Sequence, residues 1–279
     1  MSAFDRRHTL GGALLTALLL SCSTSSSPST GAAPTNIPAP PNVQPPPTSL
    51  FAANVKTVNI EIDYATGAEP YVGKAGEFAD VWELFRTSTL AIFDGKKTLS
   101  FPNKVSQMQK LDDVTAQEFT SANLLDIAAT HRDQIPGGDV STFYVVFLNG
   151  YYKDDEGTVQ KDIIGKSVAD TGVIGIFKPA IATLYSTKNP IGQYVEQLAL
   201  IHELGHAVGF VNNGVPVNTS HEDTTHGSHC TNKGCVMGFA VETVQGASQY
   251  AQKYIIGDGV LYGQECLSDA RIFETKLLK

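Results

Sequence analysis

Two histidines and a glutamate form the part of this sequence best suited to chemistry. They occur in the segment His202-Glu203-Leu204-Gly205-His206, where the histidines are four residues apart. On a helix, this spacing places both imidazoles on one face, one turn apart, within reach of a single metal ion. Zinc held by two histidines and a third ligand keeps a position open for water and lowers the pKa of that water to about 7. The segment therefore predicts a hydrolytic zinc site.

Glu203 supplies the acid and base chemistry that such a site needs. A carboxylate beside the metal-bound water can accept its proton as hydroxide attacks a carbonyl carbon, and then pass the proton to a leaving amine. These two transfers are those of peptide hydrolysis. We therefore predict that Glu203 is the general base and acid, and that the cofactor is one Zn²⁺ ion.

A third ligand must come from outside the segment. Gly209 follows His206 by three residues and suits a helix end in the left-handed conformation, after which the chain turns back beneath the metal. Five of the seven histidines lie between residues 202 and 229, a clustering that packing alone does not explain. The downstream residues leave several candidates open: His221, His226, His229, Asp223 and Glu242.

At this point the sequence resembles the metzincin peptidases, whose motif continues as His-x-x-Gly-x-x-His or Asp. Position 212 is instead Asn212, and a neutral amide is a poor zinc ligand. The later segment His229-Cys230-x4-Cys235-x-Met237 is similar to the signature of archaemetzincins. That resemblance implies His229 as the third ligand and Met237 in a turn beneath the metal. His226 and His221 remain the alternative third ligands.

The resemblance covers residues 190 to about 242, and the preceding sheet in element order only. Residues 211–216 and 221–223 are also similar to predicted bacterial lipoprotein metallopeptidases. The chain has no Cys-x-x-Cys pair downstream of Met237. A second, four-cysteine zinc site is therefore not expected.

The N-terminus has the layout of an exported lipoprotein. Arg6-Arg7 precedes an apolar stretch from residue 10 to 20, which is too short to span a bilayer, and Leu-Leu-Ser then precedes Cys22. We predict a signal peptide over residues 1–21 and lipidation of Cys22, which would anchor the chain to a bacterial membrane on the periplasmic or cell-surface side. The alternative is an ordinary signal peptide. Residues 22–50, rich in Pro and Ser, are predicted to form a tether.

Three cysteines remain after Cys22, and exported proteins commonly form disulfides. Cys230 and Cys235 are the predicted pair, because a short loop brings them together, and Cys266 is left as a free thiol.

Residues 51–279 are predicted to form the metallopeptidase domain, with an N-terminal lobe over 51–209 and a C-terminal lobe over 210–279. The expected fold class is α+β and metzincin-like: a twisted mixed sheet with helices, an active-site helix and an irregular C-terminal lobe. Periodicity predicts strands over 55–64, 98–105, 142–148, 172–177 and 180–185, and helices over 77–93, 115–132, 190–208 and 268–278. The strand over 142–148 is apolar throughout and should be buried on both faces. The strand over 172–177 is either a plain sheet strand or the edge along which substrate aligns.

The chain carries a formal net charge of -8 and shows no basic patch, which argues against binding to nucleic acid. The predicted partners are a protein or peptide substrate and, through the lipid anchor, a membrane. The predicted function is zinc-dependent endopeptidase. Two alternatives remain: a non-catalytic zinc-binding lipoprotein module, and a zinc hydrolase of a non-peptide amide.

Overall fold

The computed structural model describes residues 47–185, 189–255 and 259–279. The predicted signal peptide, Cys22 and all but the end of the tether lie outside the described residues. The short helix α1 (Pro47–Leu50) ends in Leu50, which is buried in the core with Phe51.

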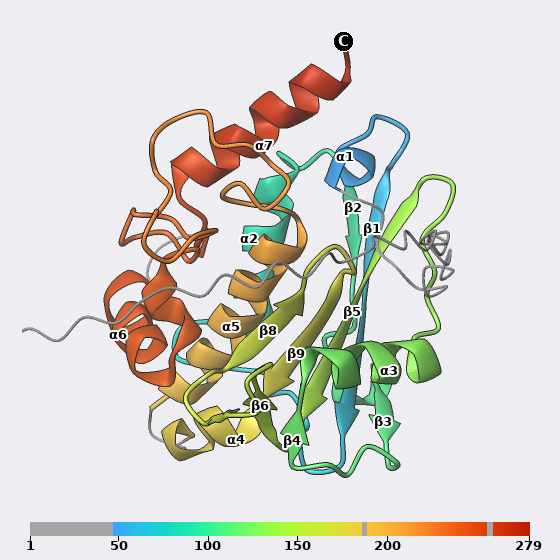
Figure 1. Ribbon diagram of the computed structural model, residues 1–279, viewed down its shortest axis with the longest axis vertical. Helices are drawn as coiled ribbons and strands as arrows, with labels where there is room; N and C mark the ends of the chain where they lie inside the picture. Colours follow the sequence, from blue (N-terminus) through green and yellow to red (C-terminus); the bar gives the residue numbers. More distant parts are fainter. Residues whose placement is uncertain (1–46, 186–188, 256–258) are drawn as a thin grey trace, which may run out of the picture. The chain divides into compact units, whose positions relative to one another are not determined.

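A mixed, six-stranded sheet forms the centre of the domain (Figure 1). Its strand order is β2-β1-β5-β9-β8, and β3 also pairs with β1. The pairs are parallel except for β8, which runs antiparallel to β9. The prediction of an α+β fold with a mixed sheet is confirmed. The strands are β1 (Thr57–Ala65), β2 (Thr98–Ser100), β3 (Gln109–Leu111), β5 (Val140–Leu148), β8 (Gly165–Val168) and β9 (Val173–Phe177).

Strand β5 lies in the middle of the sheet, as its continuous apolar sequence predicted. It pairs with β1 from Val140 to Phe147 on one side and with β9 on the other. All residues from Phe143 to Leu148 are buried. A strand covered on both faces needs apolar residues at every position, which explains the absence of alternation in its sequence.

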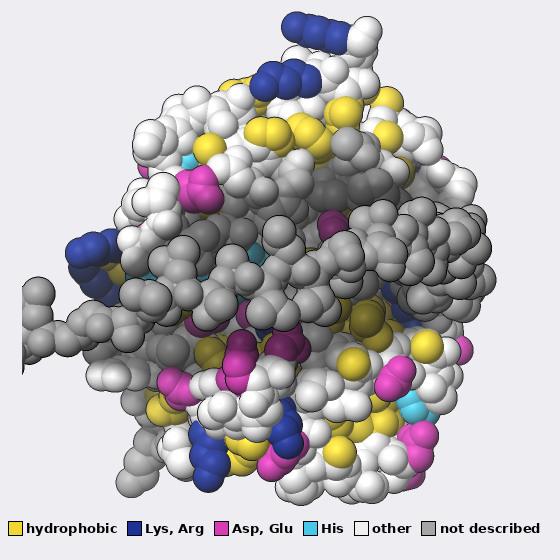
Figure 2. Space-filling view, in the orientation of Figure 1, with side chains coloured by type: hydrophobic (Ala, Val, Ile, Leu, Met, Phe, Trp, Pro, Cys, Tyr) yellow, Lys and Arg dark blue, Asp and Glu magenta, His cyan; other side chains and the backbone are white. Residues whose placement is uncertain are grey.

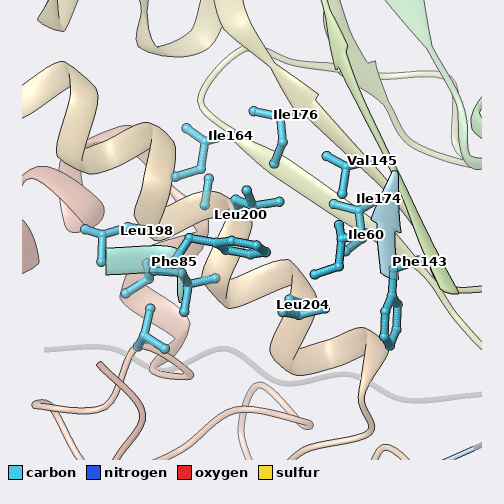
Figure 3. Close-up of a cluster of buried hydrophobic side chains, with 14 of the residues drawn as sticks. Ile60, Phe85, Phe143, Val145, Ile164, Ile174, Ile176, Leu198, Leu200 and Leu204 are labelled. Atoms are coloured by element: carbon cyan, nitrogen blue, oxygen red, sulfur yellow. The ribbon is translucent and has the colours of Figure 1, made fainter. Parts of the chain in front are cut away.

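The two faces of the sheet are covered by different helices, as strand β9 shows. A Cβ on Gly175 would lie 2.8 Å from a methyl carbon of Leu124, which belongs to helix α3 (Ser121–His131). Side chains alternate along a strand, so Ile174 and Ile176 point to the opposite face. There they join the apolar cluster that contains Leu200 and Leu204 of helix α5 (Ile191–Ala207) (Figure 3). One apolar face of the sheet thus packs against α5.

Helix α5 begins and ends close to the predicted residues. Asn189 Oδ1 accepts a hydrogen bond of 3.0 Å from the Ile191 N–H, and Pro190 precedes the first helical residue. After Ala207 the chain turns at Gly209, whose φ is +96°, a left-handed conformation that favours glycine. Gly209 therefore ends the helix as predicted, whereas the helix starts one residue later than an Asn189 cap would place it, with Pro190 as the capping residue.

The remaining helices surround this core, and the C-terminal lobe is less irregular than predicted. Helix α6 (Val244–Tyr254) packs against α5 but was missed, because its Gln-rich sequence has few strongly apolar residues, although Ala247, Tyr250 and Ala251 form a buried face. No described helix is both long and apolar enough to cross a membrane.

The other helices are α2 (Trp82–Ile92), α4 (Lys178–Ile181) and α7 (Gln264–Leu277), with 3₁₀ turns η1 (Val105–Gln107), η2 (Ala182–Leu184) and η3 (Phe239–Glu242). A small second sheet holds β4 (Glu118–Phe119), β6 (Tyr151–Lys153) and β7 (Val159–Gln160).

The strand predicted over 180–185 was wrong, and one of the two alternatives for 172–177 is excluded. Residues 180–184 form part of α4 and η2 instead of a strand, since Pro179 fixes the φ of an early helical position and starts a helical turn. Strand β9, within the predicted strand over 172–177, is not at the edge of the sheet. Strand β8 pairs with its outer side and takes the edge position.

Charged side chains of both signs are spread over the described part of the face shown in Figure 2. The Lys and Arg side chains there lie in separate groups, interspersed with Asp and Glu, rather than in one continuous basic patch.

Candidate metal centre

Three histidines from two distant segments converge at the C-terminal end of α5. The Nε2 atoms of His202 and His206 are 3.0 Å apart, and the ring centroid of His229 lies 5.3 Å and 4.9 Å from theirs. Zinc–nitrogen bonds of 2.0–2.1 Å in a tetrahedron would separate two nitrogens by about 3.3 Å. The spacing of these rings therefore suits a shared metal ion.

Backbone carbonyls fix the orientation of two of the rings. His202 donates from Nδ1 to the Val236 carbonyl at 2.7 Å, and His229 donates from Nδ1 to the Gly227 carbonyl at 2.6 Å. A proton held on Nδ1 leaves Nε2 with a free lone pair that points into the site, which is the form of histidine that binds metals. The segment after His229 thus sets the tautomer of His202, and the segment before His229 sets the tautomer of His229 itself.

Glu242, at the end of η3, brings a carboxylate to the same point. Its Oε1 lies 2.9 Å from His229 Nε2, 3.8 Å from His202 Nε2 and 3.9 Å from His206 Nε2. Burial raises the pKa of Glu242, but hydrogen bonds to His202 and His229 outweigh it and lower that pKa. Donor atoms of these four residues all lie within 4.8 Å of one another, so they could hold a metal ion. The sequence offered Glu242 only as a rival third ligand.

The imidazoles themselves respond to this crowding. Burial lowers the pKa of His202, but the Glu242 carboxylate 3.8 Å away and the charge of Glu203 raise it overall. The pKa of His206 is lowered well below its usual value by burial and by repulsion from His202 and His229. Burial and this repulsion thus favour the neutral form of His206, which is the form of histidine that binds a cation.

Glu203 is buried beside the histidines and held against the edge strand. Its Oε2 accepts a hydrogen bond of 2.6 Å from the Ser167 N–H of β8. A Cβ at position 165 would lie 2.6 Å from Glu203 Cγ, so Gly165 makes room for the carboxylate. Burial is the main cause that raises the pKa of Glu203 to about 7. A carboxylate with that pKa is well matched to accept and return a proton near neutral pH.

Met237 lies directly beneath α5 and is fully buried. A Cβ on Gly205 would lie 2.2 Å from Met237 Sδ and 3.0 Å from the ring of Tyr262. Tyr262 in turn donates a hydrogen bond of 2.6 Å to the Ile201 carbonyl. The glycine within the His-Glu-Leu-Gly-His segment therefore allows the chain carrying Met237 to pass close under the metal-facing histidines.

The structure does not bring His221 or His226 to this centre in the same way. His226 is 37% exposed at its side chain, donates from Nδ1 to Asp223 at 2.6 Å and stacks on Phe239. His221 is buried elsewhere and bonded to Asp269. Asn212 contacts Glu222 rather than any of the three histidines. Of the candidate third ligands, only His229 and Glu242 face the His202 and His206 rings.

The predicted disulfide between Cys230 and Cys235 is not formed in the structure. The three described cysteines are free and buried. The sulfur of Cys235 lies instead 3.6 Å from that of Cys266. Sequence proximity suggested the pairing, but the fold brings helix α7 to the same place.

A cleft of about 380 Å³ opens onto the metal centre. Its wall includes the candidate base and ligands, three residues of the edge strand β8 and one tyrosine of the small sheet, and the rival ligand His226 also lines it. The first group comprises Glu203, His206, His229, Glu242, Gly165, Lys166, Ser167 and Tyr152. The cleft thus places open space beside Glu203 and the histidines, where a substrate carbonyl and a water molecule can be accommodated.

Fold and site together define a mixed α+β protein with a candidate His/Glu metal centre. No protein-family model matches the sequence, and no curated protein is matched by it either. Among solved structures, the chain is similar to the crystal structure of a zinc-dependent peptidase from Methanocorpusculum labreanum (strain Z). The TM-score is 0.42 at 10% sequence identity, with 76% of this chain and 99% of that chain covered. A similarity at this score does not indicate the function of this chain. The function is therefore inferred from the geometry of the site.

Proposed function

We propose that the protein is a zinc-dependent endopeptidase of metzincin type. The observation that carries the proposal is the convergence of His202, His206 and His229 with Glu203 buried beside them at the wall of a cleft. Three neutral imidazoles suit zinc, and a carboxylate near them is the arrangement that zinc peptidases need. His229 is the proposed third ligand, and Met237 supports the centre from below.

Zinc bound by these histidines would supply an acidified water and would polarise a substrate carbonyl. Glu203 would accept a proton from the attacking water and would then deliver it to the leaving amine. The Ser167 N–H holds the Glu203 carboxylate in place during both transfers. Burial keeps the pKa of Glu203 at about 7, so the same group can take and release the proton.

Edge strand β8 is the proposed docking site for an extended substrate. It ends the sheet path, and its Lys166 and Ser167 line the cleft. An edge strand can pair with the main chain of a peptide, independently of the peptide's sequence. Such binding would present a peptide bond to Glu203 and the histidines, and it favours a peptide over a small non-peptide amide as the substrate.

The test compares Glu203→Gln with Glu156→Gln, a matched change in an exposed turn. Cleavage of a mixture of unstructured peptides is followed by mass spectrometry, and bound metal is measured in the same samples. We expect Glu203→Gln to keep its metal and lose at least about 100-fold in rate, since general acid–base catalysis contributes about 10²–10⁴-fold. Glu156→Gln should behave like wild type. Cleavage by Glu203→Gln at the wild-type rate would show that Glu203 takes no part in the mechanism. A zinc-loaded wild type that cleaves no peptide would favour the non-catalytic alternative.

We also propose export and lipid anchoring through Cys22, on the strength of the leader sequence alone. Cys22→Ser should shift the chain from the detergent phase to the aqueous phase when expressing bacteria are extracted. Partition of wild type and variant into the same phase would contradict the anchor.

A further inference from the structure

A second group of metal-binding side chains lies outside the candidate catalytic centre. It contains His221 from the loop after α5, Cys230 and Cys235 from the segment that leads to Met237, and Cys266 from α7. All four side chains are buried, with relative exposures of 4% or less. Donor atoms of His221, Cys230 and Cys266 lie within 4.8 Å of one another, and the sulfur of Cys235 lies 3.6 Å from that of Cys266.

Two of the separations between these donors fit the edges of a tetrahedral metal site. Zinc–sulfur bonds of about 2.3 Å and zinc–nitrogen bonds of 2.0–2.1 Å give an S···S edge of about 3.8 Å and an N···S edge of about 3.6 Å. The structure has an S···S distance of 3.6 Å between Cys235 and Cys266, and an N···S distance of 3.4 Å between His221 Nδ1 and Cys230 Sγ. Two opposite edges of such a tetrahedron are therefore already present.

The neighbouring groups orient the donors as they do around a metal. Asp269 accepts a hydrogen bond of 2.6 Å from His221 Nε2, which leaves Nδ1 unprotonated and directed at Cys230. A carboxylate behind the histidine is the usual support of a metal-binding imidazole. Backbone N–H groups point at two sulfurs: Gly263 to Cys235 at 3.0 Å and Asn232 to Cys230 at 3.4 Å. Donors of this kind stabilise thiolates, the form in which cysteine binds zinc.

We propose that His221, Cys230, Cys235 and Cys266 bind a second zinc ion. Three sulfurs and one imidazole complete a tetrahedron and leave no position for water, so the ion would be structural rather than catalytic. This proposal revises the expectation of one zinc ion, which depended on the absence of a second cysteine pair from the sequence. The fold supplies the missing donors from the loop after α5 and from α7, in place of such a pair.

A zinc ion here would connect three segments around the catalytic centre. It would tie the loop after α5 and helix α7 to the segment of residues 229–237. That segment carries His229 at one end and Met237 at the other, and its Cys230 N–H donates to the Met237 carbonyl at 2.8 Å. Anchoring Cys230 and Cys235 would therefore hold His229 and Met237 in register with α5.

The test measures metal content in the full chain, purified with its thiols protected from oxidation. We expect about two zinc ions per wild-type chain, and about one in both Cys266→Ser and the double variant His202→Ala/His206→Ala. Replacement of zinc by cobalt(II) should give the intense near-ultraviolet thiolate-to-cobalt band in wild type and in the double histidine variant. The band should be lost or strongly weakened in Cys266→Ser. His131→Ala is the matched control and should keep both ions. His131 lies at the end of α3 and is paired with Asp113.

The wild-type measurement decides the matter even if a variant fails to fold. One zinc ion per wild-type chain with no thiolate-to-cobalt band would overturn the proposal. So would a disulfide between Cys235 and Cys266 in the metal-loaded protein, detected by mass spectrometry of non-reduced fragments, because it would remove two of the four donors. If the three histidines of the catalytic centre bind no zinc, the chain would hold one ion and would still show the cobalt–thiolate band. That result would contradict the proposed function and leave the second zinc site standing.

Discussion

Gly205 and Met237 are in direct contact beneath the candidate metal centre: a Cβ on Gly205 would lie 2.2 Å from the Met237 sulfur. The contact joins α5, which carries two of the proposed ligands, to the segment that carries the third. Both residues are buried, so neither can move aside into solvent. The spacing between the two segments, and hence the position of His229 relative to His202 and His206, depends on the absence of a side chain at residue 205.

Gly205→Ala should therefore destabilise the protein, although alanine is a better helix former than glycine. Overpacking of a buried contact costs about 1–3 kcal/mol, which corresponds to a fall in Tm of roughly 2–10 °C for a domain of this size. Gly137→Ala is the control, because nothing lies within 4 Å of its added Cβ. Thermal unfolding followed by circular dichroism measures both. A Tm for Gly205→Ala equal to or above that of wild type would show that Met237 does not press on the helix.

Glu242→Gln should weaken zinc binding at the catalytic centre. The Glu242 carboxylate is ionised in the protein and lies within 4 Å of all three histidine Nε2 atoms, so it adds negative charge where the cation binds. Loss of a supporting carboxylate typically costs about 10–100-fold in metal affinity. Competition with a zinc chelator measures the affinity, and Glu69→Gln, an exposed site on the same chain, is the control. Equal affinities for both variants would exclude Glu242 from the centre.

His229→Ala and His226→Ala form a matched pair only three residues apart. His229 faces the rings of His202 and His206, whereas His226 is directed to Asp223 and Phe239. We expect His229→Ala to lose the catalytic zinc ion and peptide cleavage, and His226→Ala to keep the ion. Zinc quantification after gel filtration distinguishes them. The reverse result would make His226 the third ligand.

Asp63 should give the stability of the protein a distinct pH dependence. It is buried in strand β1, where Tyr144 donates a hydrogen bond of 2.8 Å to it. Burial raises the pKa of Asp63 from 3.8 to about 6, against the opposing effect of that hydrogen bond. Between these pH values the native state binds more protons than the unfolded state, so this contribution to stability falls as pH rises.

Asp63→Asn removes that contribution. Between pH 4 and 7 the wild type should lose up to about 3 kcal/mol in its free energy of unfolding relative to the variant, as 1.36 kcal/mol per pKa unit implies. Urea unfolding at several pH values measures the difference, with Asp155→Asn in an exposed turn as control. Parallel pH profiles for wild type and Asp63→Asn would contradict the raised pKa.

The parts of the site that lie close together in the sequence could be predicted from it. His202, Glu203 and His206 share one helix, so their spacing alone brings them to one place, and Asn189 and Gly209 mark the ends of that helix through local chemistry. The central strand β5 was predictable for a related reason, because a run of apolar residues shows burial without any knowledge of partners.

What could not be predicted depends on contacts between distant segments. Cys266 meets Cys235 across 31 positions in the sequence, and Ser167 meets Glu203 across 36. Strand β8 has only four residues and no strong periodicity, so its edge position next to β9 could not be predicted. Glu242 could be named only as a rival third ligand, because its position beside His229 depends on how η3 folds against the histidines.

The central claim is that zinc held by His202, His206 and His229 makes this protein a peptidase. The most direct measurement is peptide cleavage by metal-depleted protein as zinc is returned stepwise, with wild type and Glu203→Gln titrated side by side. We expect wild-type cleavage to be absent at the start and to rise until the catalytic histidines are filled, while Glu203→Gln binds the same amount of zinc and stays at least about 100-fold slower. Cleavage that persists without metal, or zinc binding that restores no cleavage to the wild type, would contradict this account.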